Sequence, residues 1–200
     1  MNAPRRFGRG AAAASIAAAA TLVATGGADP DPASAWERNP DDCRWPGSNP
    51  YIEFYMITGN QAYVDATKTA AARWNNTTVP GTIGEESPYP VDEEFRVRTT
   101  NSGSSGPYAW VAGGCLPDIY WDAPLNLWYN TGQMDSFSVE EKNVTAIHEI
   151  GHVYGLAHET TATCGTTQTG LMYPDPAKKY RDCGWTTPTS DDRSGVHAIY

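Results

Sequence analysis

Histidine is scarce in this sequence of 200 residues: the chain has four, and none of them lies before residue 148. A metal centre that uses imidazole ligands therefore has to be built from residues beyond 147. The scarcity also gives weight to any regular spacing among the four, because a rare residue seldom falls into a fixed pattern by chance.

Long apolar runs are lacking as well. The longest one, residues 11–24, follows three arginines and is too short, with these flanks, for a membrane anchor. It predicts an export signal over residues 1–35. Cleavage is expected after Ala35, with cleavage after Ala28 as the alternative, and an arginine pair near the start leaves a twin-arginine export route open.

Basic residues are in the minority: 14 Lys and Arg stand against 23 Asp and Glu, a formal net charge of −9. A negative surface disfavours nucleic acid and anionic membranes as partners. After the signal, no segment reaches the roughly 18 apolar residues of a membrane span, and no repeat or long linker divides the chain. We therefore expect residues 36–200 to form one secreted domain, which functions as a monomer.

Three of the four histidines share one pattern. Residues 148–158 read HEIGHVYGLAH, which is the string H-E-x-x-H-x-x-G-x-x-H. His148 and His152 are four residues apart, so on a helix they lie one turn apart on the same face. Gly155 allows the helix to end, because glycine adopts positive φ at little cost. The chain then turns and brings back His158.

This donor set predicts one catalytic zinc ion. Three neutral imidazoles, from His148, His152 and His158, leave the fourth tetrahedral position of Zn²⁺ for water. Glu149 follows the first histidine and points toward the open side of the metal without binding it. Zinc lowers the pKa of such a water toward about 7, and Glu149 would take its proton as general base during attack on a carbonyl.

The string resembles the signature of the metzincin zinc endopeptidases, which continues with a methionine turn. Fourteen residues after His158 stands Met172, in a Leu-Met-Tyr-Pro sequence that is similar to the matrixin branch, the matrix metalloproteinases. The resemblance implies that Met172 is an apolar floor beneath the metal. Some branches have a ligating tyrosine two residues after the methionine; here Pro174 stands there, so Tyr173 is not expected to bind zinc.

The resemblance implies an α+β fold (an α/β-type sandwich), the metzincin catalytic domain. Its twisted, mostly parallel five-stranded sheet has an antiparallel edge strand and packs on an N-terminal helix and the zinc-site helix, with a further C-terminal helix. In the sequence, β-branched and aromatic residues predict strands, and one apolar stripe predicts a helix at 60–75. The expected strands are 51–58, 95–100, 108–112, 118–121 and 125–129. In the family the antiparallel edge strand pairs with substrate; which part of 108–129 does so stays open.

The zinc-site helix has its own start signal. Ser138 and Glu141 form the pattern of a capping box. An apolar face with three-residue spacing should pack into the core while the histidines face the cleft; it consists of Val144, Ile147, Ile150 and Val153.

Near the end of the chain, Asp191 and Asp192 open a segment that resembles the C-terminal helix of matrixins. Acidic residues suit the N-terminus of a helix. His197, within this segment, is expected to be a surface residue and not a ligand.

Four cysteines in an exported chain predict two disulfides, with three possible pairings. We favour Cys164–Cys183, which brackets the methionine turn, and Cys43–Cys115. Matrixins are kept latent by a propeptide cysteine on the zinc. The residues around Cys43 loosely resemble the sequence around that propeptide cysteine, so an inhibitory role for Cys43 on the zinc is an alternative hypothesis.

Two further metal expectations follow from the resemblance. Matrixins usually carry a structural zinc on histidines before the active helix, and this chain has no histidine there. Structural calcium is common in the family and would use acidic oxygens, although solvated loop acids explain the same residues equally well. The candidates are Asp92, Glu93, Glu94, Asp118, Asp122 and Asp135.

We therefore expect a secreted zinc endopeptidase that cleaves extended protein or peptide substrates, with an apolar pocket walled by residues 173–185. The alternative is a secreted, non-catalytic binding module with the metzincin fold. Such a module is expected to lose its general base or a ligand, and this chain keeps Glu149 and all three histidines.

The histidine distribution makes a prediction about metal content. Purified protein should contain one zinc ion per chain by elemental analysis, because the second, structural set of histidines is missing. Two zinc ions retained after dialysis would contradict the assignment of a single imidazole centre.

Overall fold

The structure is a computed structural model that describes residues 37–86, 93–117, 119–160, 163–165 and 169–200. These residues fall within one compact unit, Asp31–Tyr200. The predicted export signal, residues 1–35, lies outside the described residues. None of the helices in the described part of the chain is both long and apolar enough to span a membrane.

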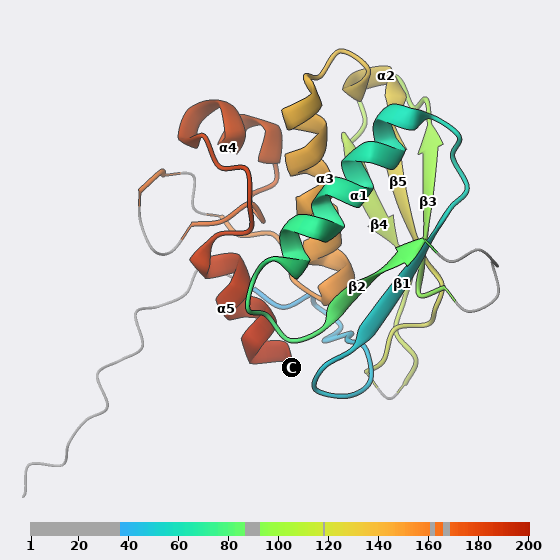
Figure 1. Ribbon diagram of the computed structural model, residues 1–200, viewed down its shortest axis with the longest axis vertical. Helices are drawn as coiled ribbons and strands as arrows, with labels where there is room; N and C mark the ends of the chain where they lie inside the picture. Colours follow the sequence, from blue (N-terminus) through green and yellow to red (C-terminus); the bar gives the residue numbers. More distant parts are fainter. Residues whose placement is uncertain (1–36, 87–92, 118, 161–162, 166–168) are drawn as a thin grey trace, which may run out of the picture. The chain divides into compact units, whose positions relative to one another are not determined.

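Five strands and five helices make up the described chain (Figure 1). The strands are β1 (Tyr51–Met56), β2 (Thr82–Glu86), β3 (Phe95–Thr100), β4 (Ala109–Ala112) and β5 (Leu125–Asn130). The helices are α1 (Gln61–Asn75), α2 (Thr131–Met134), α3 (Val139–Tyr154), α4 (Pro176–Cys183) and α5 (Ser190–Ile199).

The strands form one sheet in the order β2-β1-β3-β5-β4. All neighbours pair in parallel except β4, which runs antiparallel to β5 with Trp110 opposite Trp128. The mostly parallel five-stranded sheet with one antiparallel edge is therefore confirmed. The edge strand whose place the sequence left open is β4.

One predicted strand is wrong and another strand was not predicted. In the region 118–121, Tyr120 and Trp121 make only isolated bridges, to Arg44 and Cys115, and Ile119 has a φ of 64° that interrupts extended backbone. The fifth strand is β2 instead. Its sequence, Thr-Ile-Gly-Glu-Glu, has a glycine and two glutamates, which are poor strand formers, so the pattern gave no signal.

Helices α1 and α3 pack against each other on one face of the sheet (Figure 1). Inward-facing residues of β3 and β5 alternate with half-buried ones, and Val97, Leu125 and Leu127 are fully buried. Trp74 of α1 is buried against the ring of Tyr154 and donates from its indole Nε1 to the carbonyl of Ile147. These contacts fix α3 against the core.

Helix α3 starts and ends where the sequence predicts. Ser138 Oγ accepts from the amide of Glu141 at 3.2 Å, and Glu141 Oε2 accepts from the amide of Ser138 at 2.9 Å. The helix ends at Gly155, whose φ is 107°. The predicted apolar face is buried throughout: Val144, Ile147, Ile150 and Val153.

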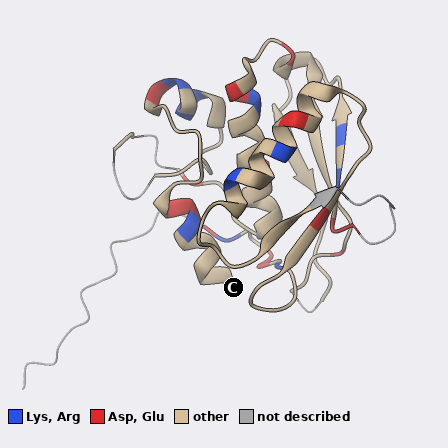
Figure 2. Cartoon of the chain, in the orientation of Figure 1, with Lys and Arg blue, Asp and Glu red and all other residues tan. Residues whose placement is uncertain are grey.

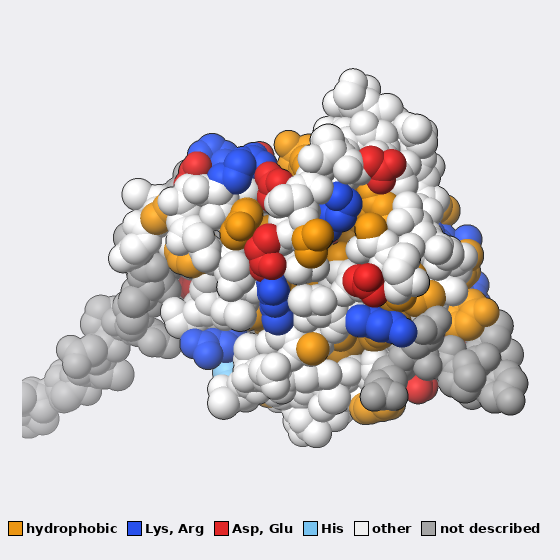
Figure 3. Space-filling view, turned by 45° about the horizontal axis from the view of Figure 1, so that its top comes forward, with side chains coloured by type: hydrophobic (Ala, Val, Ile, Leu, Met, Phe, Trp, Pro, Cys, Tyr) orange, Lys and Arg blue, Asp and Glu red, His pale blue; other side chains and the backbone are white. Residues whose placement is uncertain are grey.

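Helix α5 begins one residue earlier than predicted, at Ser190, with Thr189 as its cap. His197 is exposed, as expected. Helix α4 was not predicted, because the sequence was interpreted only as the wall of a pocket there. Lys, Arg, Asp and Glu are interspersed along the helices (Figure 2), and both signs mix with apolar side chains on the face seen in Figure 3.

Both favoured disulfides are present: Cys43–Cys115 and Cys164–Cys183. All four cysteines are thus paired, and the hypothesis of an inhibitory role for Cys43 on the zinc is wrong for this structure because the Cys43 sulfur is bonded to Cys115.

The two disulfides should contribute unequally to stability. The Cys43–Cys115 bond spans 72 residues and the Cys164–Cys183 bond spans 19. The chain-entropy model assigns them about 4.4 and about 3.2 kcal/mol. Replacing Cys43 and Cys115 with serine should lower the free energy of unfolding more than the same change at Cys164 and Cys183, as measured by urea denaturation. The reverse order would contradict this ranking.

Candidate metal centre

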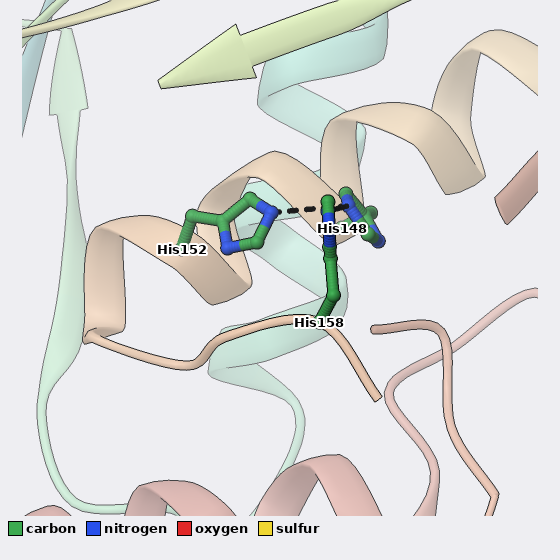
Figure 4. A group of neighbouring side chains, drawn as sticks. All are labelled: His148, His152 and His158. Carbon is green, nitrogen blue, oxygen red and sulfur yellow. Dashed lines mark hydrogen bonds between the residues drawn. The ribbon is translucent and has the colours of Figure 1, made fainter. Parts of the chain in front are cut away.

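The three histidines of the string converge (Figure 4). His148 and His152 project from one face of α3, and His158 returns from the turn that follows. The Nε2 of His148 lies 3.1 Å from the Nε2 of His152 and 3.1 Å from the Nε2 of His158. Among the described residues, this is the group of side chains that brings three metal-ligating atoms within 4.8 Å of one another.

The far ring nitrogens show which nitrogens face the centre. His148 Nδ1 lies 2.6 Å from the carbonyl oxygen of Leu171, and His152 Nδ1 lies 2.7 Å from that of Leu156. A carbonyl oxygen only accepts, so both Nδ1 atoms carry the proton, and the two Nε2 lone pairs point at each other. Ligand histidines generally have such carbonyl partners. Facing lone pairs at this distance suit a cation between them.

The separations also fit zinc. Two Zn–N bonds of about 2.0–2.1 Å at a tetrahedral angle place their nitrogens about 3.4 Å apart. The observed 3.1 Å is close to this value. Residues His148, His152 and His158 therefore fit a tetrahedral zinc ion with one position left for another ligand.

Burial keeps the imidazoles neutral. His148 is 2% exposed and His152 is half-buried. Desolvation lowers the pKa of His148 well below its ordinary value and lowers the pKa of His152 to about 4, while the pKa of the more exposed His158 is also lowered. A neutral imidazole is the form that binds metal.

Glu149 lines the cleft together with the three histidines. It is 3% exposed, and its Oε2 has no hydrogen-bond partner among the described residues. Burial raises the pKa of the carboxyl to about 8. A neighbouring cation would act in the opposite direction, because positive charge favours the carboxylate.

Met172 forms the floor beneath the centre. It is 1% exposed, and a Cβ added to Gly151 of α3 would lie 2.3 Å from the Met172 sulfur. The Met172 side chain therefore packs directly against the backbone of α3 between His148 and His152, and a larger residue at 151 would force this side chain to shift. The predicted role of Met172 as an apolar floor agrees with this geometry.

Two buried carboxylates that sequence reasoning did not assign to the site hold this floor in place. Asp192 of α5 accepts hydrogen bonds from the amides of Leu171 (3.0 Å) and Met172 (3.2 Å). Glu159 accepts from the amide of Gly170 at 2.6 Å, and its own amide donates to the carbonyl of Met172 at 3.0 Å. The only sequence signal was the position of Glu159 directly after a ligand and of Asp192 in a helix first turn.

A cleft of about 500 Å³ runs over the histidines. Residues 106–111, which include Ala109 to Val111 of β4, form one wall, and Thr145 and Glu149 of α3 form another. Pro174 and Pro176 contribute from the segment that was expected to wall an apolar pocket. Among the described residues that line the cleft there is no Lys, Arg or Asp, so the walls are neutral apart from Glu149 and the histidines.

The calcium candidates do not assemble into a site within the described residues. Glu93 pairs with Arg96, Glu94 accepts from the amide of Glu53, and Asp135 accepts from the hydroxyl of Tyr63. Asp92 and Asp118 lie outside the described residues, and Asp122 joins no group of three potential ligands there. Calcium stays a prediction.

A helix that presents two histidines to a returning third one, over a methionine floor and beside an antiparallel sheet edge, is the arrangement of a metzincin metallopeptidase domain. A family model described as metallo-peptidase family M12B, reprolysin-like, matches residues 57–189. The match covers more than half of the sequence and includes the whole candidate centre, so the chain belongs to this family.

The chain is also similar to Metalloendoproteinase 2-MMP of Arabidopsis thaliana. The two are 26% identical over 176 residues, which cover 80% of this chain and 44% of that protein. The chain thus spans less than half the length of this curated relative. The comparisons support the metzincin class predicted from the sequence; they do not assign the chain to the matrixin branch.

The lowered pKa values of the histidines predict acid-resistant zinc binding. Protons should compete for the ligands only as the pH falls well below 6.5, toward the value of about 4 for His152. Zinc content after equilibrium dialysis should therefore be nearly full at pH 6 and should fall toward pH 4. A synthetic peptide of residues 148–158, whose histidines keep ordinary pKa values near 6.5, should lose zinc at higher pH. Equal loss from protein and peptide would contradict this prediction.

Proposed function

We propose that this chain is a secreted, zinc-dependent endopeptidase in which His148, His152 and His158 bind the ion and Glu149 is the general base. The observation that carries the proposal is the position of Glu149: a buried carboxyl with an unpartnered oxygen, next to three converging neutral imidazoles. When bound, zinc supplies a Lewis acid that polarises a carbonyl and acidifies a water molecule.

Glu149 supplies the proton transfers. As the carboxylate, it accepts a proton from the attacking water, and it then returns that proton to the leaving amine. Burial raises the pKa of this carboxyl to about 8, and bound zinc would favour the carboxylate form that accepts the proton. The burial of Glu149, which is 3% exposed, supports this role because it keeps the carboxyl away from bulk water.

The edge strand β4 supports an extended peptide as the substrate. Its inner edge pairs with β5, and its residues Ala109 to Val111 line the cleft above the centre. An extended chain can therefore add to this edge by main-chain hydrogen bonds. The neutral walls favour uncharged side chains near the scissile bond.

Secretion is supported by the predicted signal at residues 1–35 and by two disulfides, which persist in oxidising surroundings. The acidic net charge supports a protein that acts on protein or peptide substrates and not on nucleic acid or membranes. The matrixin-like Leu-Met-Tyr-Pro sequence at the methionine turn supports a place in the matrixin branch of the metzincins.

Casein cleavage tests the reaction. The protein from Trp36 onward should cleave unfolded casein, and 1,10-phenanthroline should abolish cleavage. Glu149→Ala should reduce the rate by about 100- to 10,000-fold, the usual contribution of a general base. Zinc content should remain that of the unchanged protein, because Glu149 is not a ligand.

The outcomes separate the alternatives. If the unchanged protein binds zinc but cleaves no protein or peptide from neutral to alkaline pH, the hypothesis of a non-catalytic binding module is favoured. If it binds no zinc, the assignment of the three histidines is wrong.

A further inference from the structure

The first described segment of the chain lies along the turn that carries the third histidine. Arg38 forms an antiparallel bridge with Leu156. The amide of Ala157 donates to the carbonyl of Glu37 at 2.7 Å, and the amide of Asn39 donates to the carbonyl of Gly155 at 2.9 Å. Residues 37–39 and 155–157 thus form a short two-stranded contact, although more than 110 residues separate them in sequence.

The same N-terminal segment satisfies the end of α3. The last carbonyls of a helix have no partner within the helix. Here Trp45 donates from its indole Nε1 to the carbonyl of Val153 at 2.9 Å. The hydroxyl of Tyr200 donates to the carbonyl of Tyr154 at 3.0 Å and accepts from the amide of Trp45 at 3.1 Å. The carbonyl of Gly155, the next in the series, is reached by Asn39.

Both polar atoms of the Asn39 side chain are hydrogen-bonded, within its own turn and across to Gly155. Its Nδ2 donates to the carbonyls of Cys43 (2.8 Å) and Gly155 (3.2 Å). Its Oδ1 accepts from the amides of Asp41 (3.2 Å) and Cys43 (3.1 Å). The side chain therefore folds residues 39–43 into a tight turn and joins that turn to Gly155.

The fit at Gly155 is close. A Cβ added at this glycine would lie 2.7 Å from the carbonyl oxygen of Cys43 and 3.5 Å from Nδ2 of Asn39. The backbone of the N-terminal turn is thus in direct contact with the point where α3 ends.

The contact leads directly to two of the ligands. The carbonyl of Leu156, between Gly155 and Ala157, is the partner that orients His152 through Nδ1. His158 follows Ala157 in the chain. A polar group that fixes the backbone of residues 155–157 therefore sets the ring orientation of His152 and the position of His158 together.

We propose that Asn39 is a positioning residue for the metal centre: its side chain holds the turn from Gly155 to Ala157 in the geometry that aims His152 and His158 at one ion. The inference rests on the proposed zinc function of these histidines. Asn39 itself lies at the wall of the cleft and contributes no atom to the group of metal-ligating side chains.

The rest of the segment is fixed independently of Asn39. Cys43 is bonded to Cys115, and Trp45 is 4% exposed in the core. Removal of the Asn39 side chain should therefore leave the segment attached and should loosen the turn at Gly155. This makes a local effect on the metal distinguishable from general unfolding.

Asn75 offers a matched control. Its side chain also joins two parts of the backbone, donating to the carbonyl of Ile83 and accepting from the amide of Ile83, both at 2.9 Å. It lies at the end of α1 and does not line the cleft over the histidines. Asn39→Ala and Asn75→Ala thus each remove a bridging amide, and only the first touches the turn after α3.

The experiment measures zinc affinity of the full mature chain by competition with a chromophoric chelator, below the unfolding temperature of each metal-free variant. Asn39→Ala should weaken zinc binding about tenfold, the lower end of the usual effect of an outer-shell partner. Asn75→Ala should stay within about twofold of the unchanged protein. Cobalt substituted for zinc should show an altered visible spectrum in Asn39→Ala and an unaltered one in Asn75→Ala.

Asn39→Asp serves if Asn39→Ala does not fold. It keeps the acceptor for the amides of Asp41 and Cys43 but loses the side-chain donor to the carbonyls of Cys43 and Gly155, so it should weaken zinc binding in the same direction. Unchanged zinc affinity and cobalt spectrum in a folded Asn39 variant would overturn the inference, as would equal losses in the Asn39 and Asn75 variants. Absence of zinc binding in the unchanged protein would instead overturn the proposed function.

Discussion

The structure depends on how α3 ends. The helix has to bury an apolar face along its whole length and then stop within one residue, so that the chain can return to the face that carries His148 and His152. Gly155 makes this stop with a φ of 107°, at a position where a Cβ would collide with the carbonyl of Cys43. Both the left-handed conformation and the close approach require glycine. The convergence of three imidazoles follows from this one backbone feature.

Polar contacts from distant parts of the chain then hold the ligands in place. Each of the two helix-borne histidines is oriented by a carbonyl, His148 by Leu171 and His152 by Leu156. Asp192 supports the first of these from beneath, because its carboxylate accepts from the amides of Leu171 and Met172 while it also closes the capping box of α5. The carboxylate of Asp192 thus couples the start of α5 to the geometry of the centre. Loss of this side chain would therefore disturb both the helix start and the backbone that orients His148.

The sequence predicted what depends on local spacing. Residues close together in the sequence predicted the zinc string, the capping box at Ser138 and strands β3 and β5. The two disulfides could be predicted because the chain has only four cysteines, which allow three pairings. It did not predict β2, whose glycine and acidic residues have little strand preference, nor the roles of Asn39, Glu159 and Asp192. Those side chains bond mainly to backbone groups, and a backbone amide or carbonyl is present at every position. Such contacts leave no pattern in the sequence and are visible only once the chain is folded.

The environment of Glu149 links metal binding to the protonation state of its carboxyl, the proposed general base. Burial alone raises the pKa of this carboxyl to about 8, so at pH 7 the protonated form would predominate and could not accept a proton. A divalent cation on the adjacent imidazoles favours the carboxylate, because opposite charges attract strongly where water is excluded. The same low-polarity wall that makes an isolated Glu149 a poor carboxylate therefore strengthens its response to the ion. In the proposed mechanism, Glu149 therefore becomes competent as the general base once zinc is bound.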